Sequence, residues 1–512
     1  MSNAIPTPKS RMQQVLNLIE RAGNRVPHPV VIFLLLILLT MAVAHVLSMM
    51  GTSITFDRLN AETHKTEQVT ASARSLLSGE GIRFMYTSMI PNFMGFTAVG
   101  LLIAAMIGAG VAEEAGLVKA LIRKLVVVAP RWAMTYIIVF VGILSSVAAD
   151  AGYLVLIPLA GVAFLSLGRH PLAGLAAGFA SVAGAFTVNM LIKPLDAVLT
   201  EFTNDAIHLV NPSLSIDLTA NLWFSFVSVA VLTLVISLIT ERVVEPRLGA
   251  YKPSEAGGEP EAGVSPEEAR GLRFAGLALA GVLVVFGLLT LPPGAPLRDQ
   301  VTGAVIGNTP FMNHLIVFIM VLFLATGAAF GIGSGKMKGI TDVIKAIEKS
   351  LAGLGSLIFL LFIIAQFIAY FNFTNMATIM AVKMADSLKG ASIGPIWLLL
   401  CFIVVTMIVD VLINGAIAKW AIFAPVFVPI FLQLGIAPEA VLAAYRIGDS
   451  PINMITPLNA YFAMVVVVCQ KYDKNAGVGT VVALMLPYVI GISVIWTALF
   501  VVWYLLGIPF GV

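Results

Sequence analysis

The sequence predicts an all-α polytopic membrane protein, with nine transmembrane helices and two re-entrant hairpins arranged in inverted repeats. Three observations support this fold class. Of the 512 residues, 59% are hydrophobic and only 11% are charged, which exceeds the apolar content that a soluble core needs. Several apolar runs reach about 20 residues, which is enough to cross a hydrocarbon layer of about 30 Å. Two distant stretches also repeat the same order of hairpin and broken helix.

Nine apolar runs are predicted to span the membrane. Two other apolar regions, 132–167 and 395–434, are interrupted by small and polar residues, which leaves limbs of about 13 to 17 residues. Because such limbs are too short to cross the bilayer, each region is predicted to form a re-entrant hairpin. The nine predicted spans lie near residues 30–50, 93–113, 171–199, 219–240, 272–291, 315–333, 351–373, 438–468 and 477–506.

The distribution of Lys and Arg predicts the orientation. Basic residues gather in the N-terminal arm, in the stretch before the first hairpin and at 336–349, whereas 200–218 contains three acidic residues and no Lys or Arg. The positive-inside rule therefore places the basic segments in the cytoplasm. With nine spans, the N-terminus is expected in the cytoplasm and the C-terminus in the periplasm, and the two hairpins enter from opposite faces. Residues 51–90 are expected to form an external polar loop.

A stretch rich in Glu, Gly and Pro near the midpoint predicts a linker between two halves. The predicted organisation is a cytoplasmic arm at 1–29, a first transmembrane half at 30–240 with hairpin 132–167, a cytoplasmic linker at 241–271, and a second half at 272–512 with hairpin 395–434.

The composition also argues against other protein classes. The net charge of +3 is nearly balanced and no basic stretch is interleaved with aromatic residues, so nucleic acid is not an expected partner. The two cysteines, Cys401 and Cys469, lie in or beside apolar segments without a second ligand nearby, which predicts neither a disulfide nor a metal site. The expected partners are the lipid bilayer and a small solute. No cofactor is expected apart from a coupling ion such as Na⁺.

The internal repeat is the strongest functional signal. A hairpin followed by a Pro-broken helix, repeated in opposite orientations, is typical of secondary transporters whose site lies near the midplane. Any single matched proline or glycine has a packing interpretation as well, but the joint pattern favours a transporter. A shift of 267 positions superimposes Tyr153 on Trp420, Pro158 on Pro425, Gly168 on Gly435 and Pro171 on Pro438. After a short deletion, Asn189 falls on Asn453, Pro194 on Pro457 and Asp196 on Asn459.

Two strings, AKWAIFAPVFVP at 418–429 and AYRIGDSPINMITPLNAYF at 443–462, carry a specific resemblance. They resemble the p-aminobenzoyl-glutamate transporters, the AbgT family, which share an architecture with sodium-dependent dicarboxylate carriers. The resemblance covers essentially the whole chain. It implies a homodimer in the bacterial inner membrane, with nine spans and two hairpins per subunit. It also implies that ion gradients drive the movement of folate-related aryl amides or sulfonamide antimetabolites.

In one place the chain departs from the family pattern. Family members usually have serines just before the Ala-Lys-Trp of the second hairpin, whereas this chain has Asn414, Gly415, Ala416 and Ile417. The hydroxyl ligand that those serines would supply is therefore not expected here.

Arg446 and Asp449 are the main candidates for substrate binding. The planar fork of Arg446 suits a carboxylate or sulfonyl group, and the alternative is an ion pair with Asp449 three residues on. Trp420 is placed to stack on an aryl group, as is its repeat partner Tyr153; packing or interfacial anchoring is the alternative for both. The predicted substrate-binding residues are Asn414, Trp420, Arg446, Asp449 and Pro457.

A second set is predicted to couple ions. The residue that matches Asp196 in the second repeat is the uncharged Asn459. A carboxylate on only one side of a pseudo-symmetric site suits ion coupling; a salt bridge between Asp196 and Lys193 is the alternative. Asp449 is placed to carry a proton or a cation. Amide oxygens at broken backbone suit sodium, here at Asn189 and Asn453. The predicted ion-coupling residues are Asn189, Asp196, Asp449, Asn453 and Asn459, with Asp150 and Asp410 as further candidates or helix caps.

Three functions remain open at this level. The first is a secondary transporter of p-aminobenzoyl-glutamate and related aryl compounds, by import or by export, including export of p-aminobenzoate or sulfonamides. The second is a sodium-coupled dicarboxylate carrier on the same scaffold. The third is an intramembrane hydrolase that uses the Asp410 and Asp449 carboxylates. The sequence contains neither HExxH nor GxSxG, and an inverted repeat gives an enzyme no advantage. We therefore expect a transporter and not an enzyme.

Overall fold

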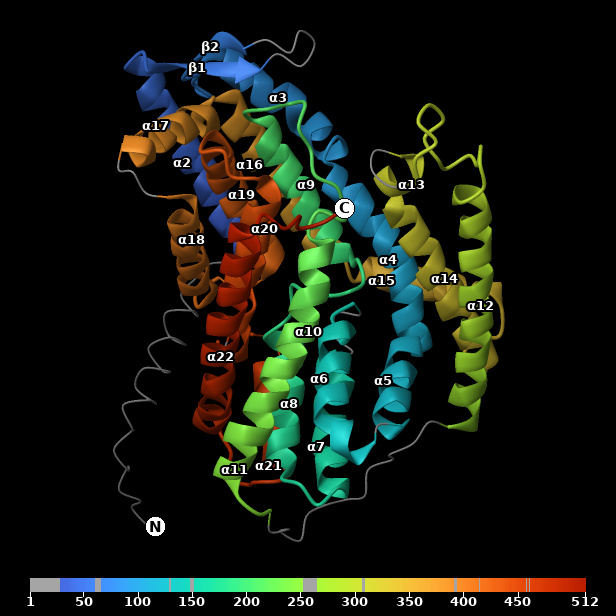
Figure 1. The fold of residues 1–512 in the computed structure, drawn as a ribbon. Helices are drawn as coiled ribbons and strands as arrows, with labels where there is room; N and C mark the ends of the chain where they lie inside the picture. Colours follow the sequence, from blue (N-terminus) through green and yellow to red (C-terminus); the bar gives the residue numbers. More distant parts are fainter. Residues whose placement is uncertain are drawn as a thin grey trace, which may run out of the picture.

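The structure is a computed structural model of the full chain, and its described part is almost entirely helical (Figure 1). The exception to the predicted all-α class is one antiparallel pair, β1 (Ser53–Leu59) and β2 (Thr66–Ser72). The described residues are 28–59, 66–128, 130–147, 152–251, 265–305, 309–390, 394–413, 415–456, 458–459 and 461–512.

The first half contains the first hairpin and the first broken span. Its helices are α2 (Pro29–Met49), α3 (Gly79–Met94), α4 (Thr97–Ala115), α5 (Leu117–Val128), α6 (Met134–Ser145), α7 (Ile157–Ser166), α8 (Pro171–Ala183), α9 (Pro194–His208), α10 (Leu222–Ile239) and α11 (Glu245–Leu248). A π-helical turn at Gly152–Leu156 precedes α7, and another at Thr240–Val244 joins α10 to α11.

The second half repeats this order at its end. Its helices are α12 (Pro266–Thr290), α13 (Pro310–Asn313), α14 (Leu315–Gly333), α15 (Ile340–Ala352), α16 (Gly355–Phe373), α17 (Met376–Gly390), α18 (Pro395–Asp410), α19 (Ala416–Gln433), α20 (Pro438–Asp449), α21 (Phe462–Gln470) and α22 (Val478–Leu505).

Eight helices of the described chain are long and apolar enough to cross a membrane, or up to nine if a bent pair counts as one span. Seven of them coincide with predicted spans, namely α2, α3–α4, α10–α11, α12, α14, α16 and α22. The other two predicted spans, 171–199 and 438–468, are each broken into two helices. The eighth is α19, whose 18 residues make it long enough to cross. The premise that both limbs of hairpin 395–434 are too short is therefore wrong for its second limb.

Three predicted loops are partly regular structure. The predicted external loop at 51–90 contains the β1–β2 pair and most of α3. The predicted linker at 241–271 is helical at both ends, because α10 continues through α11 and α12 begins at Pro266. Its acidic residues Glu241 and Glu245 pair with Arg169, so these charges hold the helix end in place. The basic segment 336–349 lies largely within the amphipathic helix α15.

The corners that follow the two hairpins have the same backbone. Gly168 and Gly435 adopt φ values of +72° and +75°, a left-handed conformation that favours glycine at the end of a helix. Pro171 and Pro438 then start α8 and α20, where a missing N–H costs no helical hydrogen bond. The predicted repeat is thus also a repeat of local geometry.

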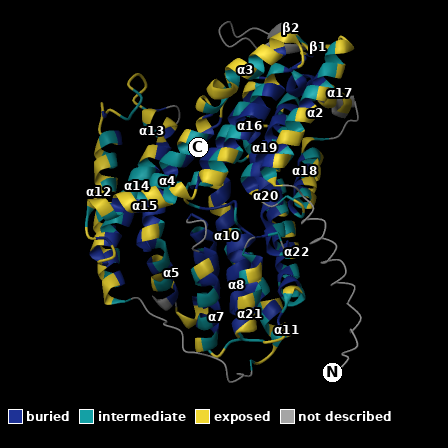
Figure 2. Ribbon diagram, turned by 180° about the vertical axis from the view of Figure 1, so that it is seen from behind, coloured by how far each residue is buried: buried dark blue, intermediate teal, exposed yellow. Residues whose placement is uncertain are grey.

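The two hairpins lie in opposite halves of the molecule. In Figure 1, α6 and α7 occupy the lower half, whereas α18 and α19 lie in the upper half. Helices α8 and α20 each pack against the hairpin of their own half. Figure 2 shows that the centre, including α8, α19 and α20, is largely buried, whereas α12 at the edge is more exposed. The inverted arrangement brings both helix breaks to the middle of the molecule.

Candidate functional site

The breaks of the two broken spans contact each other. The first break covers residues 184–193, between α8 and α9, and the second begins at Ser450. The Thr187 backbone N–H donates to Ser450 Oγ at 3.2 Å, and Thr187 Oγ1 donates to the Arg446 carbonyl oxygen at 2.9 Å. Side chains and backbone groups of one half therefore satisfy backbone groups that unwinding frees in the other, as the membrane interior requires.

Arg446 joins the two halves through a buried salt bridge. Its Nη1 donates to Asp196 Oδ1 and to the Thr187 carbonyl oxygen, both at 2.6 Å, and its Nε donates to Asn221 Oδ1 at 3.2 Å. Arg446 is only 5% exposed. The alternative of an internal pair with Asp449 is wrong within the described residues, because the carboxylate partner of Arg446 comes from α9 of the first half.

Lys193 does not use its ammonium group to pair with Asp196. Its backbone N–H donates to Asp196 Oδ2 at 2.9 Å, which caps the start of α9. Its Nζ instead donates to Ser146 Oγ at 3.1 Å and to the Phe186 carbonyl oxygen. Lys193 was predicted only as a possible partner of Asp196, although a lysine directly before the proline of a broken span is a signal in the sequence.

Asp410, Lys419 and Asp449 form a second buried charge cluster. Lys419 Nζ lies 2.8 Å from Asp449 Oδ1 and also contacts Asp410 Oδ1, and all three residues are at most 1% exposed. The Tyr445 hydroxyl lies 2.6 Å from the Ala416 carbonyl oxygen and 3.0 Å from Asp449 Oδ1. The Oδ2 atoms of both aspartates have no hydrogen-bond partner among the described residues. With all three groups ionised, this cluster carries one excess negative charge.

Asp449 and Asp410 were among the predicted candidates, but Lys419 was not. The available signal was a lone lysine in the otherwise apolar stretch of α19.

Trp420 and Tyr153 each contact the broken span of the other half. Trp420 Nε1 donates to the Leu199 carbonyl oxygen and to Thr203 Oγ1, both at 3.1 Å, and the residue is fully buried. Tyr153 stacks on Tyr461, with ring centroids 4.3 Å apart and an angle of 11° between the planes. In this conformation, the two repeat-related aromatic residues hold the halves together.

The three asparagines that were predicted for ion coupling form hydrogen bonds with backbone groups near the breaks. Asn189 Nδ2 donates to carbonyl groups at the tip of the first hairpin, and its Oδ1 accepts from the Leu191 N–H at 2.9 Å. Asn453 donates to the Asp449 carbonyl oxygen, and Asn459 donates to the Asn453 carbonyl oxygen, both at 3.0 Å. The bonds of Asn453 and Asn459 and the one that Asn189 Oδ1 accepts are local bonds by which asparagine replaces helical hydrogen bonds.

The predicted candidates Asn414, Pro457 and Asp150 lie outside the described residues. Within the described chain, no group of three or more His, Cys, Asp or Glu side chains could hold a metal ion.

A cavity of about 400 Å³ lies between the hairpin tips, the first break and helices α4 and α16. This volume is within the range of about 300–1,000 Å³ that is usual for small-molecule sites. Lys193 lines this cavity, whereas Arg446 is not among its lining residues. The walls combine Ser146 from the first tip, Ala416 from the second, Glu113 of α4, and apolar residues that include Leu102, Met106, Leu357 and Leu360.

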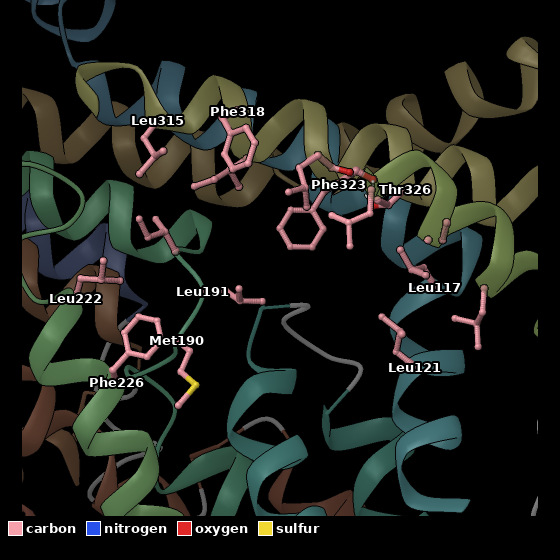
Figure 3. Close-up of a pocket in the computed structure, with 17 residues that line it drawn as sticks. Leu117, Leu121, Met190, Leu191, Leu222, Phe226, Leu315, Phe318, Phe323 and Thr326 are labelled. Carbon is pink, nitrogen blue, oxygen red and sulfur yellow. Dashed lines mark hydrogen bonds between the residues drawn. The ribbon is translucent and has the colours of Figure 1, made fainter. Parts of the chain in front are cut away.

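A larger cavity of about 560 Å³ lies between the break and helices α5, α10, α12 and α14 (Figure 3). Figure 3 shows Met190 and Leu191 of the first break, Phe226 of α10 and Phe323 of α14 around it. Thr326 supplies the one hydroxyl among its described lining side chains, and none of these side chains is charged. This cavity therefore suits apolar groups such as lipid chains, whereas the cavity at Lys193 suits a charged solute.

The comparisons with known proteins agree with this architecture. A model of the AbgT transporter family matches residues 14–512. The chain belongs to this family. It is 31% identical over 510 residues to the p-aminobenzoyl-glutamate transport protein of Escherichia coli K12, covering 99% of this chain and 98% of that protein. The resemblance inferred from the two sequence strings is confirmed.

Solved structures extend the match to the whole AbgT fold. The YdaH transporter of Alcanivorax borkumensis, described as having an unusual topology, has 38% identity and a TM-score of 0.88, over 95% of this chain and 100% of that chain. MtrF of Neisseria gonorrhoeae, described as illuminating a class of antimetabolite efflux pumps, has 37% identity and a TM-score of 0.90, over 96% of this chain and 97% of that chain. The protein is therefore a membrane transporter by family.

Proposed function

We propose that this AbgT protein is a secondary transporter that moves p-aminobenzoyl-glutamate and related aryl compounds across the bacterial inner membrane, driven by an ion gradient. The observation that carries this proposal is the contact between the two breaks, where Arg446 of one half binds Asp196 of the other beside a cavity of ligand size. The relative in Escherichia coli is named for transport of this compound. The working unit is a homodimer, as the family resemblance implies.

The cavity supports an aryl substrate. Leu102, Met106, Leu357 and Leu360 offer apolar contact for a ring, and the charged or hydroxyl-bearing side chains of the described lining are Glu113 of α4, Ser146 and Lys193. Such a mixture of apolar walls and few placed polar groups is usual for small-molecule sites. Because elements of both halves line the cavity, a relative movement of the halves would change its access.

The Asp410–Lys419–Asp449 cluster supports ion coupling. Two carboxylates share one ammonium group in a fully buried place, and each retains an oxygen without a hydrogen bond in the described chain. An uncompensated buried charge is costly, so the cluster favours uptake of one positive charge. We propose that a proton or a sodium ion neutralises this cluster during the transport cycle, with Asp449 next to Tyr445 as the responding group.

Export is the second candidate direction. MtrF, to which this chain is similar over nearly its full length, is described as one of a class of antimetabolite efflux pumps. An efflux role would use the same cavity with sulfonamides or p-aminobenzoate as the solute.

Flux measurements with purified protein in proteoliposomes test the proposal. Radiolabelled p-aminobenzoyl-glutamate should accumulate under an imposed gradient and stop accumulating when the driving gradient is collapsed; separate collapse of the proton and sodium gradients identifies the ion. Asp449→Asn should abolish gradient-driven accumulation, whereas the exposed control Asp386→Asn should leave it unchanged. Hydrolysis of the solute without accumulation would contradict the proposal, and a preference for succinate would favour the dicarboxylate carrier.

A further inference from the structure

We propose that Lys193 is the residue that recognises the carboxylate of an aryl carboxylate anion in the cavity between the hairpin tips. This inference rests on the proposed function and deepens it, because it assigns the charge of the substrate to one side chain. Lys193 lies in the first break, directly before Pro194, and its side chain lines the cavity of about 400 Å³.

All contacts of the Lys193 ammonium group that the structure shows are with neutral groups. Its Nζ donates to Ser146 Oγ at 3.1 Å and to the Phe186 carbonyl oxygen, and it lies 5.2 Å from the centroid of the Phe186 ring. In the described part of the chain, Lys419 and Arg446 lie within 4.0 Å of a carboxylate oxygen, whereas Lys193 Nζ has no carboxylate oxygen within that distance. The nearby carboxylate of Asp196 is already bound by Arg446.

Burial makes this arrangement costly without a bound anion. Lys193 is only 2% exposed, and the penalty for taking an ammonium ion out of water is several kcal/mol unless a partner compensates it. An ammonium group has three N–H donors. Two of them reach Ser146 and Phe186, which leaves one for an acceptor inside the cavity. A carboxylate bound there would offset the penalty and form a charge-assisted hydrogen bond.

The other residues that line the cavity determine which chemical group can carry the bound carboxylate. Leu102 and Met106 of α4 and Leu357 and Leu360 of α16 line the cavity together with Lys193, so an apolar ring fits beside the charged end. Glu113 of α4 is the one carboxylate residue in the described lining, and its negative charge makes the position of a bound anion specific to the Lys193 side. A free inorganic anion would leave the apolar side chains without contact. The ligand class is therefore a small aryl compound that carries a carboxylate, which p-aminobenzoyl-glutamate and p-aminobenzoate share.

Lys193 has no basic counterpart at the matching position of the second half. Lys193 precedes Pro194 in the first break, and the residue that precedes the matching proline of the second break is Thr456. Thr456 lies close to the Val411 carbonyl oxygen in the second hairpin, at 3.5 Å. The anion site is therefore on the side of the first hairpin, whereas the excess negative charge of the Asp410–Lys419–Asp449 cluster is on the side of the second.

Binding measurements on the full-length protein in detergent test the inference. The probes are p-aminobenzoyl-glutamate, p-aminobenzoate and the uncharged analogue p-aminobenzamide. Lys193→Met should weaken binding of both anions at least tenfold and change the affinity for p-aminobenzamide less than threefold. Lys193→Arg, which keeps the charge, should retain anion binding within about threefold of wild type, and Lys345→Met, at an exposed lysine, should match wild type.

The melting temperature of the ligand-free protein separates recognition from a structural role. Because Met removes a buried charge that has no salt-bridge partner within 4.0 Å in the described part of the chain, Lys193→Met should melt at or above the wild-type temperature. A lower melting temperature, or failure to fold, would assign Lys193 a structural role and overturn the inference. Unchanged anion affinity in Lys193→Met, or an equal loss for p-aminobenzamide, would also overturn it. If the wild type binds the anions in a Lys193-dependent manner but does not carry them across a bilayer, the proposed function fails and the inference stands.

Discussion

The two broken spans share a backbone design but differ in their charges. Both follow a hairpin, turn at a left-handed glycine, begin with a proline and unwind near the middle of the molecule. The first carries Lys193 and Asp196 around its break, whereas the second carries Arg446 and Asp449 just before its break. The difference shows that the repeat builds the framework, while the charges assign separate tasks to the two halves.

The charge contacts follow the same division. Arg446 pairs across the halves with Asp196, so this salt bridge holds the two breaks together. Asp449 pairs within its own half with Lys419 of α19. A cross-half pair must change when the halves move, whereas a pair within one half can move as a unit. Substitutions at these positions therefore test the division directly.

Arg446→Ala should produce the largest effect. It leaves Asp196 buried without its cation, which typically costs about 3–5 kcal/mol, and we expect transport in proteoliposomes to be abolished. The double variant Arg446→Ala with Asp196→Asn removes the uncompensated charge and should recover most of the stability, measured by thermal unfolding, but not the transport. If Arg446→Ala alone transports at the wild-type rate, the cross-half salt bridge has no role in transport.

Trp420→Phe should have an intermediate effect, because it removes one contact between the second hairpin and the first broken span. The change keeps an aromatic ring but removes the N–H that reaches Leu199 and Thr203 on α9. We expect a loss of about 1–2 kcal/mol in the free energy of unfolding, read from chemical denaturation, together with slower transport. The exposed Trp397→Phe is the matched control. Equal stability of the two variants would show that the contact with α9 is energetically neutral.

His170→Gln should have the smallest effect, visible as a pH dependence. His170 Nδ1 accepts from the Leu172 N–H at the start of α8, whereas the matching Ala437 offers no such cap to α20. The corner lies outside the predicted spans. Burial lowers the pKa of His170 below its usual 6.5, and Glu245 and Asp473 partly oppose this shift.

The sign of the His170 effect follows from the lowered pKa. The folded protein favours the neutral ring, so this contribution to stability is present above about pH 6.5 and is lost as the pH falls below that value. The melting temperature of wild type should therefore fall more between pH 7 and pH 5 than that of His170→Gln, by an amount equivalent to at most about 1 kcal/mol. Identical pH profiles would mean that the protonation of His170 does not contribute to the pH dependence of stability.

Much of the fold could be predicted because membrane helices leave long apolar runs in the sequence. The runs that became α2, α10, α12, α14, α16 and α22 needed only length and composition. The second limb of hairpin 395–434 was misjudged, because a Pro-containing helix such as α19 can remain continuous over 18 residues when packing supports it. The amphipathic α15 was missed because its stability comes from packing against α4 rather than from an apolar run.

The helix breaks around the candidate site could be predicted from the sequence, but the pairings of their side chains could not. Periodicity and proline placement locate the breaks, so Arg446, Asp449, Asp196 and Trp420 could be named from the sequence. Their partners could not be. Arg446 and Asp196 are 250 positions apart, and Trp420 and Leu199 are 221 apart. A local pair three residues away, such as Arg446 with Asp449, looks more favourable until the helices are placed in space.

Hydropathy and proline placement act locally along the chain, so the sequence alone predicts a membrane protein with two related halves and a broken helix in each half. The pairing of the charges depends on which helices cross at the middle of the molecule, so it follows only from the three-dimensional arrangement. That crossing binds Asp196 to Arg446, binds Asp449 to Lys419, and leaves Lys193 at the cavity with neutral partners among the described residues.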